Sequence, residues 1–346
     1  MKFKRLEAPY LRSDNAVSAM MLQVLVALIP GTIAYVWFFG PGLLINMLLA
    51  GLFCVGFEAA MVHLRGRKIE EVLMDYTAII TAVLIAFALP PLTPWWVTAT
   101  ACLFAIVVAK HLYGGIGYNV FNPAMVGYVV ALVAFPQHMN LWLPPHIGDM
   151  DYGTLSLTQT LAYTMTGNLP VAFDDISRAT PLDMVQAGLK QMRTIEEMRA
   201  LPLMGDFGGR GWEWIGNFIA LGGIGLLIRK VIRWHIPVAV IAGVLVPATI
   251  AFLIDPGTHA GPGFHLFSGA TLLCAFFIAT DPVSAAASPS GRLIYGFGIG
   301  VLIYAIRQWG AYADGVAFAV LLMNMAVPAI DALTRTRIVG HRGARS

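Results

Sequence analysis

Long uninterrupted apolar runs are the feature that most constrains what this chain can fold into. The runs are about 15–22 residues long, close to the ~20 residues that carry an α-helix across a ~30 Å hydrocarbon core. A transmembrane β-barrel instead has segments of about 10 residues in which apolar and polar side chains alternate. The predicted spans cover roughly residues 17–39, 42–63, 76–89, 94–110, 121–136, 212–229, 236–254, 264–280, 291–308 and 315–333. We therefore predict an all-α polytopic membrane protein with about ten transmembrane helices.

The balance of charged and apolar residues excludes several classes of protein. The chain is 58% hydrophobic and 12% charged, whereas soluble domains average about 45–50% apolar and about 25% charged residues. So few charges cannot cover a water-facing surface of this size, which excludes a soluble globular enzyme. The net charge of +3 builds no basic stripe, so we expect no nucleic-acid partner.

Cysteines and histidines form no metal-binding pattern. The three cysteines (Cys54, Cys102 and Cys274) are isolated within apolar runs, and the eight histidines show no HxxxH or HExxH spacing. Metal sites bring such ligands together at short, regular spacings. We therefore predict no metal site.

The distribution of lysine and arginine predicts the orientation in the membrane. If the N-terminus is cytoplasmic and ten spans alternate in direction, 16 of the 22 basic residues fall on the cytoplasmic side, as the positive-inside rule requires. The first apolar run follows a polar start and lacks a small-residue cleavage site, so we expect it to be retained as a span. The sequence thus predicts a multi-pass membrane protein with both termini in the cytoplasm.

One long polar segment, residues 137–211, divides the chain into membrane parts 1–136 and 212–346 with five predicted spans each. It contains eight of the 19 acidic residues and is expected on the outer side, opposite the cytoplasm. Because five is odd, the second part enters the membrane in the opposite orientation, which predicts two inverted repeats with a site between them. Within 180–200, Leu182, Val185, Leu189 and Met192 have helical spacing and predict an amphipathic helix.

Two polar motifs interrupt the spans at corresponding places in the two parts. The first, KHLYGGIGYNVFNPAMVGY (110–128), contains Asn119 and Asn122, and the second, ATDPVSAAASPSGR (279–292), contains Asp281 and Ser284. A carboxylate, amides and hydroxyls at that depth suit either a cation path or hydrogen bonds to a flat polar ligand. Helix caps and tight turns are the other interpretation.

Two charged side chains fall within predicted spans. Glu58 lies about one turn from His63, which is typical of a carboxylate at the membrane rim or between helices, or of a proton or cation relay. Arg307, near the outer end of its span, is expected to be an interfacial anchor or the partner of Asp314.

The segment FDDISRATPLDM (173–184), together with the two polar motifs, resembles the D-type subunit of the Rnf complex. That complex is an ion-translocating ferredoxin:NAD oxidoreductase, also called the electron transport complex. The sister family is the B-type subunit of the Na⁺-translocating NADH:quinone reductase. The resemblance covers essentially the whole chain. The Asn-Pro-Ala and Ala-Thr-Asp-Pro-Val-Ser-Ala segments are specific to these two families.

The resemblance implies FMN bound by a phosphodiester bond to a threonine on the outer side, in a Ser/Thr-x-Ala-Thr sequence. That sequence maps onto 177–180, with Ser177 first, Thr180 as the acceptor, and Arg178 where the general pattern favours glycine. The stretch 268–271 fits the general pattern better, but Thr271 lies inside an apolar run that a transferase and a charged phosphate could hardly enter. We therefore expect Thr180 to be modified. Arg178 is expected to offset phosphate charge, and Asp183 either supports the flavin or belongs to a solvent-facing scaffold.

In function, the resemblance implies a subunit of the bacterial inner membrane, with the segment 137–211 in the periplasm. It further implies that this subunit couples electron transfer between ferredoxin and NAD to Na⁺ or H⁺ translocation. This chain alone would have no complete active site and no catalytic residue. Related subunits also bind riboflavin without a covalent bond, which we expect near Asn119, Asn122, Asp281 and Ser284. The implied partners are the other Rnf subunits, including Fe–S and flavin subunits, a flavin transferase and membrane lipid.

Two other functions fit the same topology. A stand-alone solute transporter or channel of urea-channel-like architecture also has inverted five-helix repeats with short broken spans. A structural scaffold of a complex is the third interpretation and predicts no cofactor. The discriminating feature is the 75-residue polar segment, because a plain channel needs no such segment carrying an acceptor threonine.

Overall fold

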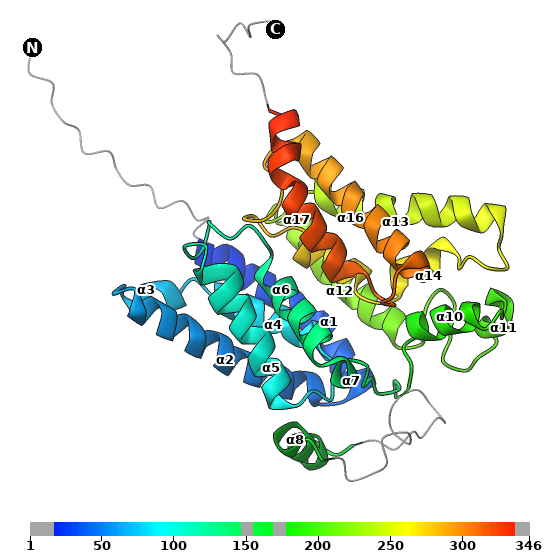
Figure 1. Ribbon diagram of the computed structural model, residues 1–346, viewed down its shortest axis with the longest axis horizontal. Helices are drawn as coiled ribbons and strands as arrows, with labels where there is room; N and C mark the ends of the chain where they lie inside the picture. The colour runs from blue at the N-terminus through cyan, green and yellow to red at the C-terminus, as the bar shows by residue number, and fades with distance from the viewer. Residues whose placement is uncertain (1–16, 147–154, 169–177, 336–346) are drawn as a thin grey trace, which may run out of the picture.

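The computed structural model describes residues 17–146, 155–168 and 178–335, and these residues are mainly helical (Figure 1). The membrane helices of the first part are α1 (Val17–Phe39), α2 (Gly42–Leu64), α4 (Thr77–Ala88), α5 (Trp95–Leu103) continued by the π-helix η1 (Phe104–His111), and α6 (Pro123–Ala134), with the short α3 (Ile69–Leu73) beside them. Those of the second part are α12 (Trp212–Ile228), α13 (His235–Ile254), α14 (Pro262–Phe267), α15 (Thr271–Leu273) continued by the π-helix η2 (Cys274–Ile278), α16 (Pro289–Trp309) and α17 (Val316–Leu333).

The apolar helices agree with a multi-pass membrane protein. Five of them, α1, α2, α13, α16 and α17, are long and apolar enough to cross a membrane. The shorter apolar helices are 77–88, 95–111, 123–134 and 212–228. A helix lies within each predicted span, whereas the total of ten membrane crossings and the inverted repeat stay predictions.

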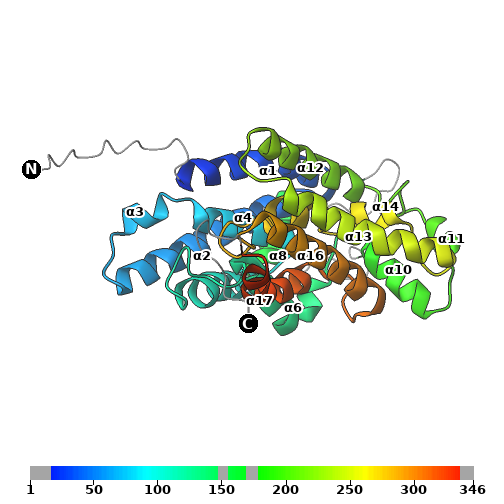
Figure 2. The ribbon, with the colours of Figure 1, turned by 90° about the horizontal axis from the view of Figure 1, so that it is seen from above.

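The two membrane parts pack against each other through two helix pairs, α1 with α12 and α6 with α17 (Figures 1 and 2). Small residues permit the close approach of α1 and α12, since a Cβ atom added to Gly222 would lie 1.8 Å from the carbonyl oxygen of Ala27. Small residues play the same role between α13 and α16, where Gly243 faces Gly300. Such contacts are typical of membrane helices, which associate through close packing of backbones.

The predicted span 264–280 is interrupted. Helix α14 ends at Phe267, and the chain turns at Gly269, whose φ of +64° favours glycine, before α15 begins at Thr271. The backbone N–H of Ala270 donates to Oδ2 of Asp314 at 2.9 Å, so a carboxylate from outside the helix stabilises the break. The apolar pattern of 264–280 contains no sign of this interruption.

The segment 137–211 contains more helix than its weak periodicity predicts. Its helices are α7 (Pro136–Met139, overlapping the end of the first part), α8 (Leu157–Thr166), α10 (Pro181–Lys190) and α11 (Ile195–Arg199). Helix α10 confirms the expected amphipathic helix, with Leu182 and Val185 buried against Ile195 of α11 and Phe264 of α14. Met192 is an exception because it lies beyond the helix, with φ +60° and its side chain exposed. We call the end of the molecule that carries α8, α10 and α11 the loop side (Figure 1).

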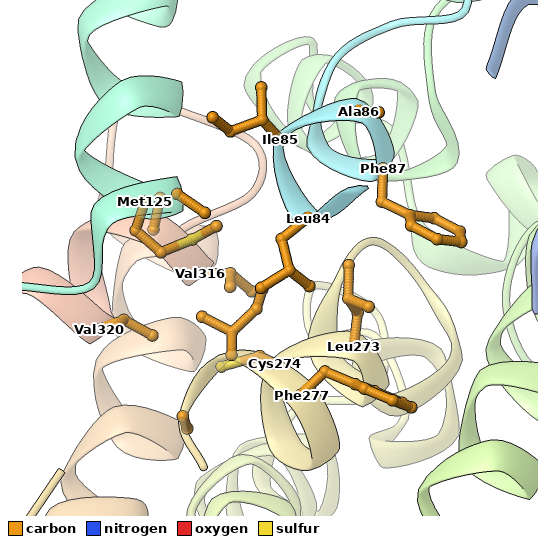
Figure 3. Close-up of a cluster of buried hydrophobic side chains, with 14 of the residues drawn as sticks. Leu84, Ile85, Ala86, Phe87, Met125, Leu273, Cys274, Phe277, Val316 and Val320 are labelled. Atoms are coloured by element: carbon orange, nitrogen blue, oxygen red, sulfur yellow. The ribbon is translucent and has the colours of Figure 1, made fainter. Parts of the chain in front are cut away.

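An apolar cluster fills the centre of the molecule (Figure 3). It joins α4, α6, η2 and α17 through side chains such as Leu84, Met125, Phe277 and Val316. This cluster lies between two cavities that are described below. Met125 and Val316 also line the cavity at Thr180, and Leu84 and Phe277 also line the cavity at Asp281.

Candidate functional site

Thr180 is the N-cap of α10, and its side chain is fixed by a capping box. Its hydroxyl donates to Oδ2 of Asp183 at 2.6 Å and accepts from the backbone N–H of Asp183 at 3.2 Å, while the Thr180 N–H donates to Oδ2 at 3.3 Å. Pro181 occupies the first helical position, where the missing N–H costs nothing. Local sequence therefore determines this geometry: Thr, Pro and Asp at these spacings favour a helix start with the threonine just outside it.

Of the two predicted residues before Thr180, only Arg178 is among the described residues. Ser177 lies outside the described residues. The side chain of Arg178 is exposed, and its backbone N–H donates to the carbonyl oxygen of Trp142 at 2.9 Å, which holds the acceptor segment against residues 141–143.

Thr180 and Asp183 line a cavity between the two membrane parts, which we call the Thr180 cavity. Its aromatic wall consists of Tyr35, Phe87, Tyr128, Trp142, Trp212 and Tyr312, and the interrupted span contributes Gly269, Ala270, Leu272, Leu273 and Ile278. Trp142 and Trp212 contact each other edge to face, with ring centroids 5.0 Å apart. The cavity thus combines a hydroxyl and carboxylates with flat apolar surfaces that reach the centre of the molecule.

Asp314 also lines this cavity and forms an ion pair with Arg307. The distance from Nη2 of Arg307 to Oδ1 of Asp314 is 2.9 Å, and the arginine side chain is 2% exposed. The same guanidinium donates to the carbonyl oxygens of His265 and Ser268, at 2.6 and 3.0 Å. The predicted pairing with Asp314 is confirmed, whereas an exposed interfacial anchor is excluded by this burial.

Thr271 has a different environment from Thr180. Its side chain is fully buried at the start of α15, and its hydroxyl donates to the carbonyl oxygen of His265 at 2.8 Å. An enzyme could reach this hydroxyl only after the interrupted span had moved. The burial agrees with the preference for Thr180, although it does not test the modification.

A second cavity, which we call the Asp281 cavity, lies on the side opposite the loop side and brings together Asn119, Asn122 and Asp281. Lys110, Arg233, Arg292 and Asp331 also line it. Its volume of about 560 Å³ is within the ~300–1,000 Å³ typical of ligand pockets. Ser284 is not part of the lining; its hydroxyl donates to Oδ2 of Asp281 at 2.7 Å and so orients the carboxylate.

The amide of Asn122 is largely engaged in holding the fold together. Its side-chain oxygen caps α6 by accepting from the N–H of Met125 at 3.3 Å, and its side-chain nitrogen donates to the carbonyl oxygen of Ile278 at 3.2 Å. Its backbone N–H donates to Oδ1 of Asn324 on α17 at 3.1 Å. Asn119 donates to the carbonyl oxygen of Phe121 at 3.1 Å within its own turn. Of the three predicted residues that line this cavity, Asp281 therefore has the clearest capacity to bind a ligand.

Sequence reasoning missed a buried charge cluster at the same end of the molecule. Glu58 is 1% exposed and lies between helices, as one of the interpretations expected: its two carboxylate oxygens lie 2.8 Å from Nζ of Lys110 and 3.1 Å from Nε2 of His111. Nζ of Lys110 also donates to the hydroxyl of Thr77 at 2.9 Å, and Arg65 donates to the His111 carbonyl oxygen.

The π-helix η1 carries two members of this cluster. Lys110 and His111 lie at its end, and both contact Glu58. Such π-segments are rare and often occur at functional sites. The adjacent pair Lys-His at the end of an apolar run is the one local signal in the sequence. Within the described parts of the chain, no group of three or more His, Cys, Asp or Glu side chains comes together that could hold a metal ion.

Comparisons with known proteins cover almost the whole chain. The model of the NQR2, RnfD, RnfE family matches residues 5–340. The D-type subunit of an ion-translocating oxidoreductase complex from Vibrio cholerae is 47% identical over 357 residues, which cover 99% of this chain and 100% of that protein. Proteins with the same name are 47% identical in Aeromonas hydrophila, covering 98% of this chain and 99% of that protein, and 44% identical in Salmonella arizonae, covering 99% of each. The chain therefore belongs to the NQR2, RnfD, RnfE family.

Proposed function

We propose that this chain is the membrane subunit of an ion-translocating oxidoreductase complex and that it carries FMN on Thr180 through a phosphodiester bond. The relatives are named as one subunit of such a complex, which supports a redox role and argues against a stand-alone channel. The flavin assignment rests on one observation: Thr180 lines a cavity whose wall contains several aromatic side chains. Neither a channel nor a scaffold needs an acceptor hydroxyl at that place.

The residues around Thr180 fit this cofactor. Trp142, Trp212 and Tyr312 present flat aromatic faces, and such faces stack favourably on ring systems. The enclosed volume of about 150 Å³ is smaller than the ~300–1,000 Å³ of common ligand pockets. A ring system held at Thr180 would therefore extend towards the loop side, where a partner subunit can approach it. FMN supplies the electron-transfer chemistry, and this chain supplies attachment, orientation and local charge.

In this proposal, the subunit takes part in electron transfer between reduced ferredoxin and NAD, coupled to Na⁺ or H⁺ movement across the bacterial inner membrane. The loop side faces the periplasm and both termini face the cytoplasm, as the distribution of basic residues favours. Fe–S centres and the sites for ferredoxin and NAD belong to partner subunits, because this sequence has no nucleotide-binding GxGxxG after a strand. A flavin transferase acting on the periplasmic side attaches the FMN.

For the Asp281 cavity, we propose a role as a second flavin site, for riboflavin, or as part of the ion path. Asp281 offers a carboxylate to a cation or to a hydroxyl or N–H donor of a ligand, and Ser284 fixes its orientation. The mixture of basic and acidic residues in the lining suits a polar ligand without net charge. The cavity volume of about 560 Å³ fits a molecule with a three-ring system.

The test is flavin fluorescence of the full-length protein on a denaturing gel, after expression with a flavin transferase. We expect a fluorescent band for the wild type and for Thr271→Val, and none for Thr180→Val. A wild type without a band, in a host whose transferase labels another target, contradicts the flavoprotein proposal. A band that survives Thr180→Val and is lost in Thr271→Val shows that the other threonine is the acceptor.

A further inference from the structure

We propose that Asp183 activates the Thr180 hydroxyl for flavin attachment by accepting its proton, so that the acceptor protein supplies the base for its own modification. The inference rests on the proposed function of Thr180 as the acceptor. It concerns the attachment step, not the later electron transfer, and follows from the hydrogen bond between Oγ1 of Thr180 and Oδ2 of Asp183.

The capping box at Thr180 differs from the two others in the described parts of the chain. In the box of α11, Thr194 and Glu197 are joined by two backbone-to-side-chain bonds of 3.2 and 3.3 Å, and no hydrogen bond links the hydroxyl to the carboxylate. In the box of α8, the third residue is Gln159, an amide that cannot act as a base at neutral pH. At Thr180 the hydroxyl donates directly to a carboxylate, at 2.6 Å. Helix capping alone does not require that third bond, as α11 demonstrates.

The hydrogen bond from the Thr180 hydroxyl to Asp183 suits the chemistry of flavin attachment. A threonine hydroxyl is a weak nucleophile and gains reactivity when an adjacent base takes its proton. The donor of the FMN group is a flavin dinucleotide with a phosphoric anhydride bond, FAD. Oγ1 of Thr180 forms a bond to the FMN phosphorus while the bond from that phosphorus to the bridging oxygen breaks, and AMP leaves with the oxygen. The hydroxyl proton passes to Oδ2 of Asp183, and no electrons are gained or lost.

The charges around Thr180 are compatible with this step. The product carries a new negative charge next to Asp183, and protonation of this carboxylate removes the repulsion between the two. The other carboxylate of the cavity, Asp314, is already paired with Arg307 at 2.9 Å. The positive end of the α10 dipole, at the N-terminus of this 10-residue helix, favours an anion at the N-cap. Thr180 is only partly buried, so a transferase can reach its hydroxyl.

The experiment measures the rate of attachment to the full-length protein. The protein is purified from a host without flavin transferase and incubated with transferase and several concentrations of FAD, and covalent flavin is followed by fluorescence on denaturing gels. The variants are Asp183→Asn, which keeps a hydrogen-bond acceptor for the cap but is not a base, Asp183→Ser, and Asp183→Glu. The control is Glu197→Gln, which makes the corresponding change in the capping box of α11. Rates are expressed per folded protein, measured by thermal unfolding with a thiol-reactive dye.

We expect Asp183→Asn and Asp183→Ser to lower the maximal rate by at least about tenfold, as loss of a general base does, with the half-saturating FAD concentration unchanged. Asp183→Glu should restore most of the rate, and Glu197→Gln should match the wild type. A maximal rate of Asp183→Asn within twofold of the wild type overturns the role of Asp183. Loss of apparent FAD affinity at an unchanged maximal rate also overturns it, because that result indicates a structural effect. A wild type that is never labelled contradicts the proposed function itself.

Discussion

Replacing Asn324 by leucine should destabilise the junction between the two membrane parts. Asn324 is fully buried on α17 and makes three hydrogen bonds: Oδ1 accepts from the N–H of Asn122 at 3.1 Å, and Nδ2 donates to the carbonyl oxygen of Ser284 at 3.1 Å and the hydroxyl of Tyr295 at 2.8 Å. Leucine has the same number and branching of side-chain heavy atoms as asparagine, so the change removes the hydrogen bonds with little change in shape. The N–H of Asn122, the carbonyl oxygen of Ser284 and the hydroxyl of Tyr295 each lose their hydrogen bond to residue 324.

The expected magnitude follows from the number of bonds lost. Hydrogen bonds between membrane helices contribute about 0.6 kcal/mol on average and up to about 1.7 kcal/mol each. Three such bonds give a loss of about 2–5 kcal/mol in the free energy of unfolding. With an unfolding entropy of about 2.1 cal/mol/K per residue, we expect the unfolding temperature of a chain of this size to fall by about 3–7 °C.

The three cysteines, which are free and buried, provide the assay. A dye that becomes fluorescent on reacting with thiols reports their exposure while the detergent-purified protein is heated. Met325→Leu is the matched control, because Met325 is the next residue on α17 and is 63% exposed. Only the bond to Asn122 crosses between the two parts; the other two hold α17 within the second part. An Asn324→Leu protein that unfolds at the wild-type temperature refutes the view that this network stabilises the packing of α17.

Two further predictions use the same assay. Gly300→Val should prevent correct packing of α16 on α13, because an added Cβ atom would lie 2.3 Å from a carbonyl oxygen of α13. The control is Gly225→Val, which should unfold like the wild type because nothing lies within 4 Å of the added Cβ atom. Equal stability of the two variants would contradict this prediction. Burial lowers the pKa of His138, in α7 on the loop side, below its usual 6.5, so the His138 imidazole binds a proton more readily in the unfolded chain than in the folded one. The contribution of neutral His138 to the free energy of unfolding is therefore present above pH ~6.5 and is lost as the pH falls through the lowered pKa of the folded state. The unfolding temperature should therefore drop between pH 7.5 and 5.5 by less in His138→Phe than in the wild type, and an unchanged drop would show that His138 has no part in it.

The sequence predicted the elements of this fold well where the pattern is local. Apolar runs located the membrane helices, since the length and polarity of a run decide whether it can enter a bilayer. The start of α10 was readable in the same way, because Thr180, Pro181 and Asp183 have the spacing of a capping box. From the sequence, however, Asp183 was expected only as flavin support or scaffold, and the hydroxyl-to-carboxylate bond became visible in the structure.

Predictions that depend on distant partners were less complete. Glu58 was expected near His63, a neighbour in the chain, but it pairs with Lys110 and His111, which the packing of η1 against α2 brings to it. Asn122 was expected either as a ligand or as a helix cap, and its amide caps α6 and also joins it to η2. The pairing of Glu58 and the bond from Asn122 to η2 leave no periodic signal, because the partners are far apart in the chain.

By itself, the sequence determined that this is a helical membrane protein and where its apolar helices lie, and it predicted that Thr180 is more accessible than Thr271. These properties depend on the polarity and spacing of neighbouring residues, which act before any tertiary contact forms. The tertiary structure alone decided that Thr180 shares a cavity with Asp314, and that Arg307 and Asp314 stabilise the break at 268–270. The physical reason is burial: a charge or an open helix end inside the membrane must find a partner, and only packing of the two parts determines which residue comes within reach.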